Sequence, residues 1–355
     1  MVLGALLSDK HVTLSQLGHA ASVELLCMGL AAALSAALLP PRHLRPIGVA
    51  ASVVLALGNF ATPAVMGEAV TALRMLTGAA GGLLIWLAAS MIARSASPER
   101  WAGIYLTVQT LAQFIFAAVM ATWIAPAHAT RGDFSLLAVA GVVCAMVSLA
   151  LPASFADLSS REGSANAHGS PVVPPPRGLA ALAVNLLLMM CIISIWVYYE
   201  PIAREAGLST KISDAAISVS LAFQVLGGIA ATLFAPRLKW FPVFLVCAVV
   251  DFAMIALLGV RPSAALFLAD AAVFGFIWLF ILPFLVPMLI EADATRRSAV
   301  LISGVSLLGS SLGPTLAGLV INSQHTQGAL WFGAACLGAS LAIAIALRFT
   351  VSCSR

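Results

Sequence analysis

Charged side chains are scarce in this sequence. Lys, Arg, Asp and Glu make up 9% of its 355 residues, whereas a soluble domain of ordinary composition carries about 25%. Hydrophobic residues make up 61%, and the mean hydropathy is +1.05. So little polar material cannot cover a soluble globule, and the apolar runs are long and continuous rather than alternating as in a transmembrane β-barrel. The sequence therefore predicts an all-α, polytopic membrane protein.

Residue patterns typical of catalysis or metal binding are also missing. The six cysteines form no CxxC pair, and the six histidines are dispersed without an HExxH motif. No lysine follows a glycine-rich phosphate loop. The basic residues stand mostly singly at the ends of apolar runs, which is typical of topology signals. We therefore expect no enzyme activity, cofactor, metal or nucleic-acid partner, and we expect the lipid bilayer and a small-molecule substrate as partners.

Eleven apolar segments are long enough to cross a bilayer core, which requires ~20 residues per helix. A proline- and serine-rich polar stretch at 152–177 separates five of these spans from six. The sequence thus predicts an N-terminal helical bundle (1–151), a linker (152–177) and a C-terminal six-helix bundle (178–355). The predicted spans are 17–39, 46–66, 69–93, 101–124, 133–151, 178–200, 213–235, 240–260, 263–290, 296–321 and 327–349.

Lysine and arginine set the expected orientation, because cytoplasmic loops carry an excess of them. If the linker is cytoplasmic, twelve Lys and Arg residues lie on that side and five on the other. The sequence therefore predicts a multi-pass inner-membrane protein whose C-terminus and central linker are cytoplasmic.

The two halves contain a weak internal repeat. LSQLG at 14–18 aligns with ISDAA at 212–216, an offset of 198, and PERWA at 98–102 aligns with TRRSA at 295–299, an offset of 197. Parallel repeats of six spans are one recurrent transporter architecture. At this offset the span at 178–200 has no counterpart in the first half, so we expect an N-terminal bundle of five spans from which the first helix is missing.

Several motifs resemble the major facilitator superfamily. The run RMLTGAAG at 74–81 looks like the R-x-x-x-G pattern of that family's fourth helix, and DATRR at 293–297 followed by GSSLGPTLAG at 309–318 resembles its later loop and eleventh helix. Basic turns at 42–45 and 237–239 lie where the family's cytoplasmic signature loops fall. The resemblance implies two six-helix bundles that rock about a substrate held between them.

Two departures from the family pattern stand out. The loop at 40–46 lacks the family's Gly-x-x-x-Asp-Arg-x-Gly-Arg-Arg form. The Gly-Pro motif typical of drug/proton antiporters is absent from 101–124 and occurs only within 296–321. The second departure disfavours a drug antiporter.

Charged residues inside spans are costly in lipid and are functional hypotheses by default. Arg74 and Glu24 have similar depths in their spans, so they are expected to be able to pair as a proton-coupling element or as a static ion pair. Asp270 lies on 263–290, a helix that lines the cavity in the family. Asp251 is interpreted as structural, or as paired with a neighbouring hydroxyl.

Polar side chains also form stripes along several spans. Gln109 and Gln113 share a helical face with Tyr105, and Ser306 and Ser310 mark one face of 296–321. Either stripe is expected to line a pathway or to hydrogen-bond a neighbouring helix. Three further residues complete the predicted pathway, namely Asn185, Trp196 and Gln224. Trp196, Tyr198 and Tyr199 fit an interface belt better than a ligand cage.

The function favoured by these observations is secondary active transport of a small organic solute by alternating access. Proton coupling is a hypothesis drawn from Arg74, Glu24 and Asp270, and a monomer is expected. The alternative is a non-transporting, transporter-like membrane protein or an inactive truncated fragment. An intramembrane enzyme is disfavoured because no metal or nucleophile cluster is present.

Overall fold

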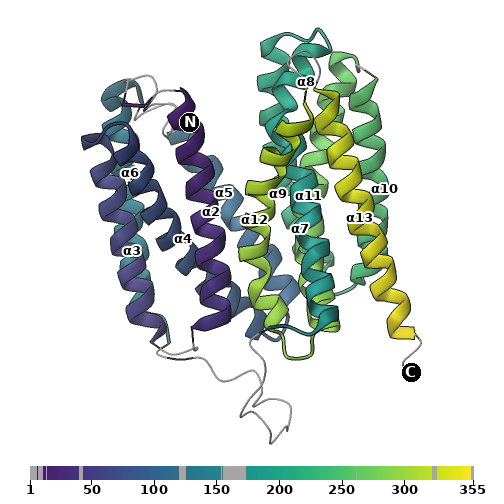
Figure 1. Ribbon diagram of the computed structural model, residues 1–355, viewed down its shortest axis with the longest axis horizontal. Coiled ribbons are helices and arrows are strands. Elements are labelled where there is room, and N and C mark those ends of the chain that lie inside the picture. The colour runs from purple at the N-terminus through teal and green to yellow at the C-terminus, as the bar shows by residue number, and fades with distance from the viewer. Residues whose placement is uncertain are drawn as a thin grey trace, which may run out of the picture. The chain divides into compact units, whose positions relative to one another are not determined.

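A computed structural model describes residues 6, 11–12, 14–39, 43–119, 125–152, 154, 173–260, 262–321 and 326–352. Over these ranges the regular elements are helices, as expected for an all-α chain (Figure 1). They are α2 (Leu14–Leu38), α3 (Leu44–Ala61), a 3-10 turn (Thr62–Ala64), α4 (Glu68–Arg94), α5 (Pro98–Val119), α6 (Ala125–Ser148), α7 (Pro176–Val197), α8 (Tyr199–Glu205), α9 (Thr210–Phe234), α10 (Trp240–Gly259), α11 (Ala264–Ala292), α12 (Arg297–Val320) and α13 (Gln327–Ser352).

Ten of the described helices are long and apolar enough to cross a membrane. They correspond to ten of the eleven predicted spans. The remaining span, predicted at 101–124, coincides with α5, which opens with the charged pair Glu99 and Arg100 and carries two glutamines. Residues 120–124 of that span lie outside the described residues, as do residues 155–172 of the predicted linker.

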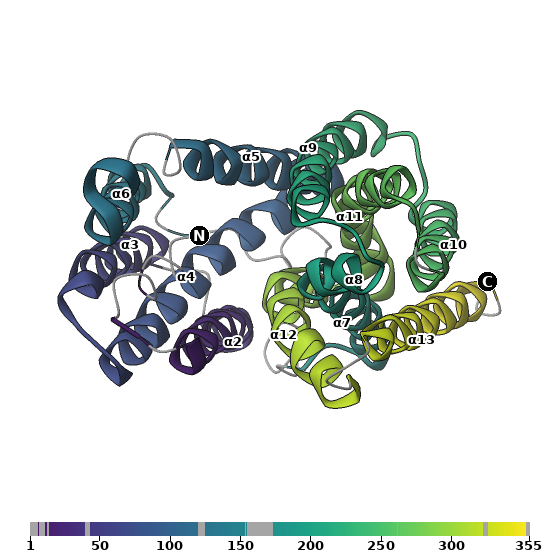
Figure 2. The ribbon, with the colours of Figure 1, turned by 90° about the horizontal axis from the view of Figure 1, so that it is seen from above.

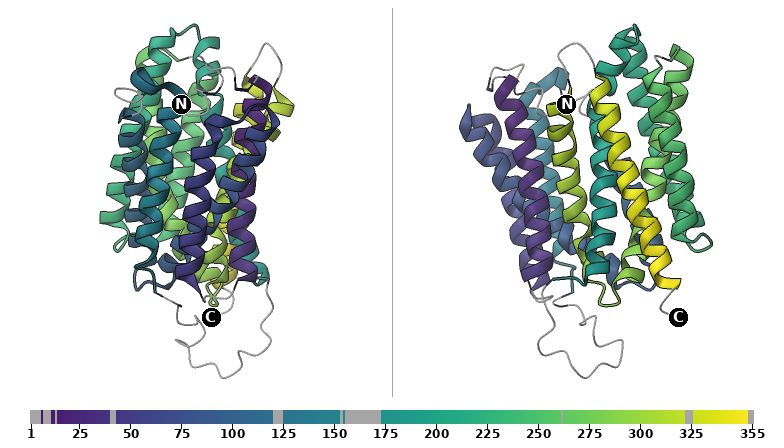
Figure 3. Two further views of the ribbon diagram at one scale, coloured as in Figure 1. Left: turned by 90° about the vertical axis from the view of Figure 1, so that its left-hand side faces the viewer. Right: turned by 45° about the vertical axis from the view of Figure 1, so that its right-hand side comes forward.

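The chain divides into two compact units. The first comprises Met1–Met91, Gln113–Val173 and Ser303–Leu308, and the second comprises Ile92–Ala112, Pro174–Ile302 and Gly309–Arg355. Within each unit the long helices run roughly parallel or antiparallel to one another (Figure 3). The bundle boundaries drawn from the sequence stay a prediction.

In the first unit, α2 and α4 approach closely because glycine leaves room for backbone. A Cβ placed on Gly78 of α4 would overlap the carbonyl oxygen of Glu24 on α2. Small residues at helix contacts allow this approach in lipid, where packing rather than the hydrophobic effect drives association. Helices α3 and α6 form another packed pair in the same unit. The close approach of α2 and α4 places Glu24 beside the turn of α4 that carries Arg74.

In the second unit, α9 packs along α11, and α7 packs along α13 (Figure 2). A Cβ on Gly275 of α11 would overlap the carbonyl oxygen of Ser220 on α9. Gly275 lies 197 residues after Gly78, which is the offset of the sequence repeat. Close glycine contacts therefore recur at equivalent positions of the two halves.

The loop between α11 and α12 is ordered by one carboxylate. Asp293 Oδ1 accepts hydrogen bonds from the Thr295 backbone N–H (3.0 Å) and hydroxyl (2.6 Å). Its Oδ2 accepts from the Ser298 backbone N–H and hydroxyl, each at 2.9 Å. Burial acts to raise the pKa of the Asp293 carboxyl, but these hydrogen bonds outweigh it and hold the pKa below its ordinary value. Asp293 thus satisfies a free N–H in the first turn of α12.

Replacing this carboxylate should make protein stability depend less on pH. Asp293→Asn is expected to lower the stability at neutral pH by about 1 kcal/mol, the usual net value of a hydrogen bond, because the amide has one accepting oxygen where the carboxylate has two. Because the folded pKa is depressed, the stabilisation is complete above the unfolded value of about 3.9 and is lost as the pH falls through the folded pKa. Melting temperatures across this range, with the exposed Asp214→Asn as control, measure the effect. An unchanged gap between wild type and variant at acidic pH would contradict it.

Candidate functional site

A buried arginine organises a polar cluster in the first unit. Arg74 of α4 is 3% exposed. Its Nη1 donates to Glu24 Oε1 on α2 at 3.3 Å and to Asn59 Oδ1 on α3 at 3.1 Å. Its Nη2 donates to Thr62 Oγ1 at 2.6 Å and to the Gly58 carbonyl at 3.5 Å. One guanidinium thus joins three helices.

The carboxylate of this cluster is held from two sides. Glu24 Oε1 lies 3.3 Å from Arg74 Nη1 and 3.2 Å from Thr77 Oγ1. The Arg74 guanidinium also lies over the Phe134 ring, 5.3 Å from its centroid, as in a cation–π contact. The pairing of Arg74 with Glu24 that their depths suggested is therefore present, and both charges are compensated within the unit.

A cavity of about 290 Å³ adjoins the cluster. Glu24, Asn59 and Arg74 supply its polar atoms, and the rest of its wall is mainly apolar. A largely apolar hollow with a few convergent polar groups is the usual form of a small-molecule site. The apolar lining residues are Leu55, Phe134, Leu137, Ala140, Gly141 and Cys144.

Two members of this cluster were missed in the sequence. Asn59 and Thr62 interrupt the apolar run of α3 and the 3-10 turn that follows it, and both are buried. Polar residues three apart near a helix end share one side of the helix. That spacing was a signal for an inward-facing pair, but the partner helix could not be identified from one sequence.

A second cluster lies in the other unit around Asp270 of α11. Tyr199, the first residue of α8, donates its hydroxyl proton to Asp270 Oδ2 at 2.6 Å. The Tyr199 ring lies 4.7 Å from that of Phe267, and Trp196 meets Trp278 edge-on at 5.6 Å. Tyr199 is fully buried, so the expectation that it belongs to an interface belt is wrong. The reason is local: α7 ends at Val197, and the chain turns at Tyr198 into α8.

Several buried polar atoms of this unit lack hydrogen-bond partners among the described residues. Both carboxyl oxygens of Asp251 on α10 are unpartnered, as is Nε2 of Gln224 on α9. The expectation that Asp251 pairs with a neighbouring hydroxyl is therefore wrong. Of the Asp270 oxygens, Oδ1 is likewise buried without a partner.

The other residues of the predicted pathway lie apart from these clusters. Asn185 is fully buried and donates from Nδ2 to the Ile302 carbonyl of α12 at 3.3 Å, so it links two helices of the second unit. Gln109 and Gln113 are exposed on α5, while Ser306 and Ser310 are half-buried on α12. Within the described residues no group of three His, Cys, Asp or Glu side chains is placed to hold a metal ion.

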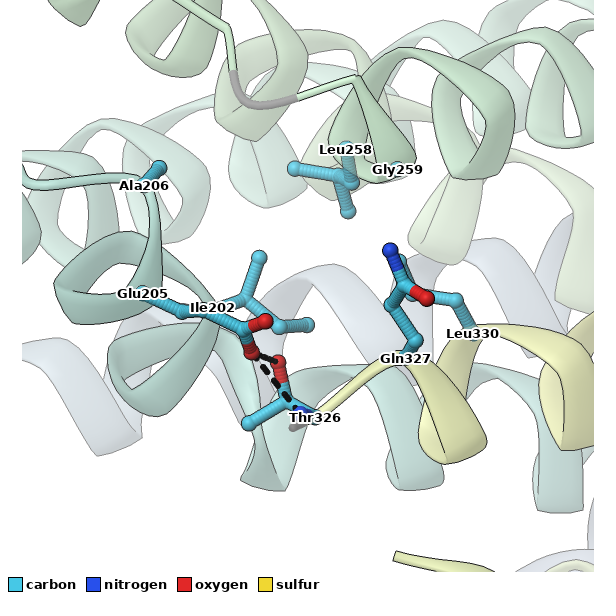
Figure 4. A pocket seen from close by; sticks show the side chains of 8 residues that line it. All are labelled: Ile202, Glu205, Ala206, Leu258, Gly259, Thr326, Gln327 and Leu330. Atoms are coloured by element: carbon cyan, nitrogen blue, oxygen red, sulfur yellow. Dashed lines mark hydrogen bonds between the residues drawn. The ribbon is translucent and has the colours of Figure 1, made fainter. Parts of the chain in front are cut away.

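A small hollow in the second unit serves the structure rather than a substrate (Figure 4). Its volume is about 10 Å³, close to the space that one water needs. On one side, Glu205 Oε2 at the end of α8 accepts from the Thr326 backbone N–H (2.8 Å) and hydroxyl (2.6 Å). Glu205 thereby fixes α8 to the start of α13.

Over its described residues the chain is all-α, with ten apolar helices of spanning length and charges buried inside them, so it is a multi-pass membrane protein. The chain has the fold of the major facilitator superfamily, since solved structures of that class match nearly its whole length. No protein-family model matches the sequence, and no curated protein sequence matches it significantly.

Three of the similar structures illustrate the likeness. The E. coli fucose:proton symporter FucP has a TM-score of 0.78 at 11% identity, over 98% of this chain and 93% of that chain. The proton:xylose symporter XylE has a TM-score of 0.72 at 13% identity, over 96% and 90%. The human organic anion transporter MFSD10 has a TM-score of 0.68 at 16% identity, over 93% and 82%. At these identities the likeness shows the fold.

Proposed function

We propose that the chain is a secondary active transporter that moves a small organic solute across the inner membrane by alternating access, coupled to protons. The fold supports this proposal, because structures with the same fold include two proton-linked sugar symporters. In this proposal the protein acts as a monomer, and its linker and C-terminus lie in the cytoplasm.

The observation that carries the proposal is the Arg74 cluster. A buried arginine with acceptors on α2, α3 and the 3-10 turn is costly to maintain in lipid, and such groups mark substrate or ion pathways. The adjoining cavity exposes one carboxylate, one amide and one guanidinium to a bound solute. These groups suit the hydroxyl or carboxylate oxygens of a small polar molecule, because together they offer both donors and acceptors.

Counterflow in proteoliposomes tests the proposal. The purified protein is reconstituted and loaded in turn with unlabelled L-fucose, D-xylose and benzoate, and entry of the labelled solute is followed. Transient accumulation of one of these solutes supports transport, and internal acidification reported by trapped pyranine supports proton coupling. Folded protein that exchanges none of a broad panel of sugars and organic anions would contradict the proposal.

The polar stripes give a separate test of a water-filled pathway. In a background without the native cysteines, Cys at position 109, 113 or 306 is expected to react with a membrane-impermeant thiol reagent. Cys at position 111 should stay unreacted, because its leucine is exposed on the intervening face of α5, where lipid is expected. Mass spectrometry of the labelled protein in native membranes measures the difference. Equal labelling at 109, 111 and 113 would mean that the stripe does not line a pathway.

A further inference from the structure

The second unit contains a carboxyl group that nothing in its surroundings compensates. Asp251 lies near the middle of α10, within an otherwise apolar helix, and is 4% exposed. Neither of its oxygens has a hydrogen-bond partner among the described residues. An ionised carboxylate placed in this way would be extremely costly, and such groups bind a proton instead.

In the part of the chain that the structure describes, no cation pairs with this group. Helices α11 and α13 pack most extensively against α10. Neither α10 nor α11 contains a Lys, Arg or His, and α13 carries only Arg348, three turns from its buried cysteine and near Glu291. The titratable groups that interact electrostatically with Asp251 are Asp270 on α11, Cys247 on its own helix and Cys191 on α7. Cys336 on α13 in turn interacts with Cys191. Tyr199 reaches the same region through Asp270.

The neighbouring carboxyl has a different environment. Asp270 Oδ2 receives the Tyr199 hydroxyl at 2.6 Å, within the range of a charge-assisted O–H···O⁻ bond. A negative charge is therefore stabilised on Asp270 and not on Asp251. Asp251 and Asp270 interact electrostatically, so two negative charges there would repel each other. Because only Asp270 has a hydrogen-bond donor, the pair favours a state in which one proton is bound, on Asp251.

The first unit presents the opposite case. The carboxylate of Glu24 is paired with Arg74 at 3.3 Å and is 21% exposed. Thr77 Oγ1 adds a contact at 3.2 Å to the same oxygen. Unlike Asp251, Glu24 therefore has both a cation and a hydroxyl donor beside its carboxylate.

We propose that Asp251 and Asp270 form a proton-binding site in which Asp251 carries the proton and Tyr199 holds the charge on Asp270. The role of this site as carrier of the coupling proton rests on the proposed transport function. The protonation of Asp251 itself is inferred from the burial of its carboxyl group and from the lack of hydrogen-bond partners among the described residues. Binding adds one proton to a carboxylate oxygen of Asp251, and release returns it to water admitted beside α10.

Infrared spectroscopy tests the site without any transport measurement. In reconstituted wild-type protein at neutral pH, we expect a C=O stretching band of a protonated carboxyl that shifts in D₂O. Asp251→Asn should remove that band, whereas Glu24→Gln and the exposed control Asp214→Asn should retain it. A wild-type spectrum without the band, or a band that survives in Asp251→Asn, would overturn the proposal.

Two further measurements keep the test decisive. Asp251→Val replaces a neutral side chain by an apolar one of similar size, so it should melt at or above the wild-type temperature. A large loss of melting temperature in both Asp251 variants would show that the carboxyl is ionised and paired.

The coupling role has a separate test in transport. Asp251→Asn should lower proton-driven accumulation of the solute at least tenfold, and full accumulation would refute that role. A wild-type protein that transports nothing would contradict the proposed function and leave the infrared result to decide the site.

Discussion

Replacement of Arg74 by alanine is expected to abolish transport and to destabilise the first unit. The substitution removes the donors for Glu24, Asn59 and Thr62 at once. Breaking a buried ion pair by deleting one partner typically costs about 3–5 kcal/mol, because the remaining charge is left uncompensated. Displacement of the groups that line the cavity should remove transport, since misplacement of about 1 Å already lowers rates by roughly 100-fold in enzymes.

The matched variants separate charge from geometry. Arg74→Lys keeps the charge but not the planar fork, so it should restore stability in part and transport poorly. Arg204→Ala removes an arginine whose pair with Glu200 is exposed (72% and 52%), so it should change little. Initial rates of counterflow and melting temperatures in detergent measure both effects. Near-normal uptake by Arg74→Ala would refute a role for the cluster in transport.

The fold was largely predictable because a long apolar run can satisfy its backbone hydrogen bonds within the bilayer by forming an α-helix. The polar breaks around Pro236 and after Glu291 mark helix ends within a few residues of their positions in the structure. Two boundaries differ in an instructive way. Helix α6 begins at Ala125 rather than at 133, and α8 separates from α7 after Val197. Both changes occur near helix ends, where hydropathy alone does not define the backbone path.

Site residues were predictable where their depth in the span agreed with a family motif. They were missed where their role depends on which neighbouring helix their side chain faces. Arg74 stood out as a charge in an apolar run, and its depth matched that of Glu24. By contrast, the burial of Tyr199 depends on the turn at Tyr198, and the isolation of Asp251 depends on which side chains α11 and α13 present to it. Sequence periodicity gives a helical face, but the neighbour of that face is set by packing.

The close contact between α9 and α11 should make the second unit intolerant of a single added carbon. A Cβ on Gly227 of α9 would overlap the carbonyl oxygen of Phe276, and one on Gly275 of α11 would overlap that of Ser220. The obstacles are backbone atoms in two long helices, so neither can move aside without separating the pair. Each glycine-to-alanine change is therefore expected to destabilise the protein by about 1–3 kcal/mol, the usual cost of overpacking.

A third glycine provides the matched control for this prediction. At Gly338 of α13 an added Cβ would meet only Phe252 Cζ at 3.7 Å, an ordinary van der Waals contact. Gly338→Ala should thus be neutral or stabilising by about 0.5–1 kcal/mol, because alanine favours helix more than glycine does. Thermal unfolding in one detergent compares the three variants, and the double variant Gly227→Ala with Gly275→Ala should lose most of its folded yield. If all three alanine variants shift the melting temperature in the same direction, α9 and α11 do not pack at the distance seen in the structure.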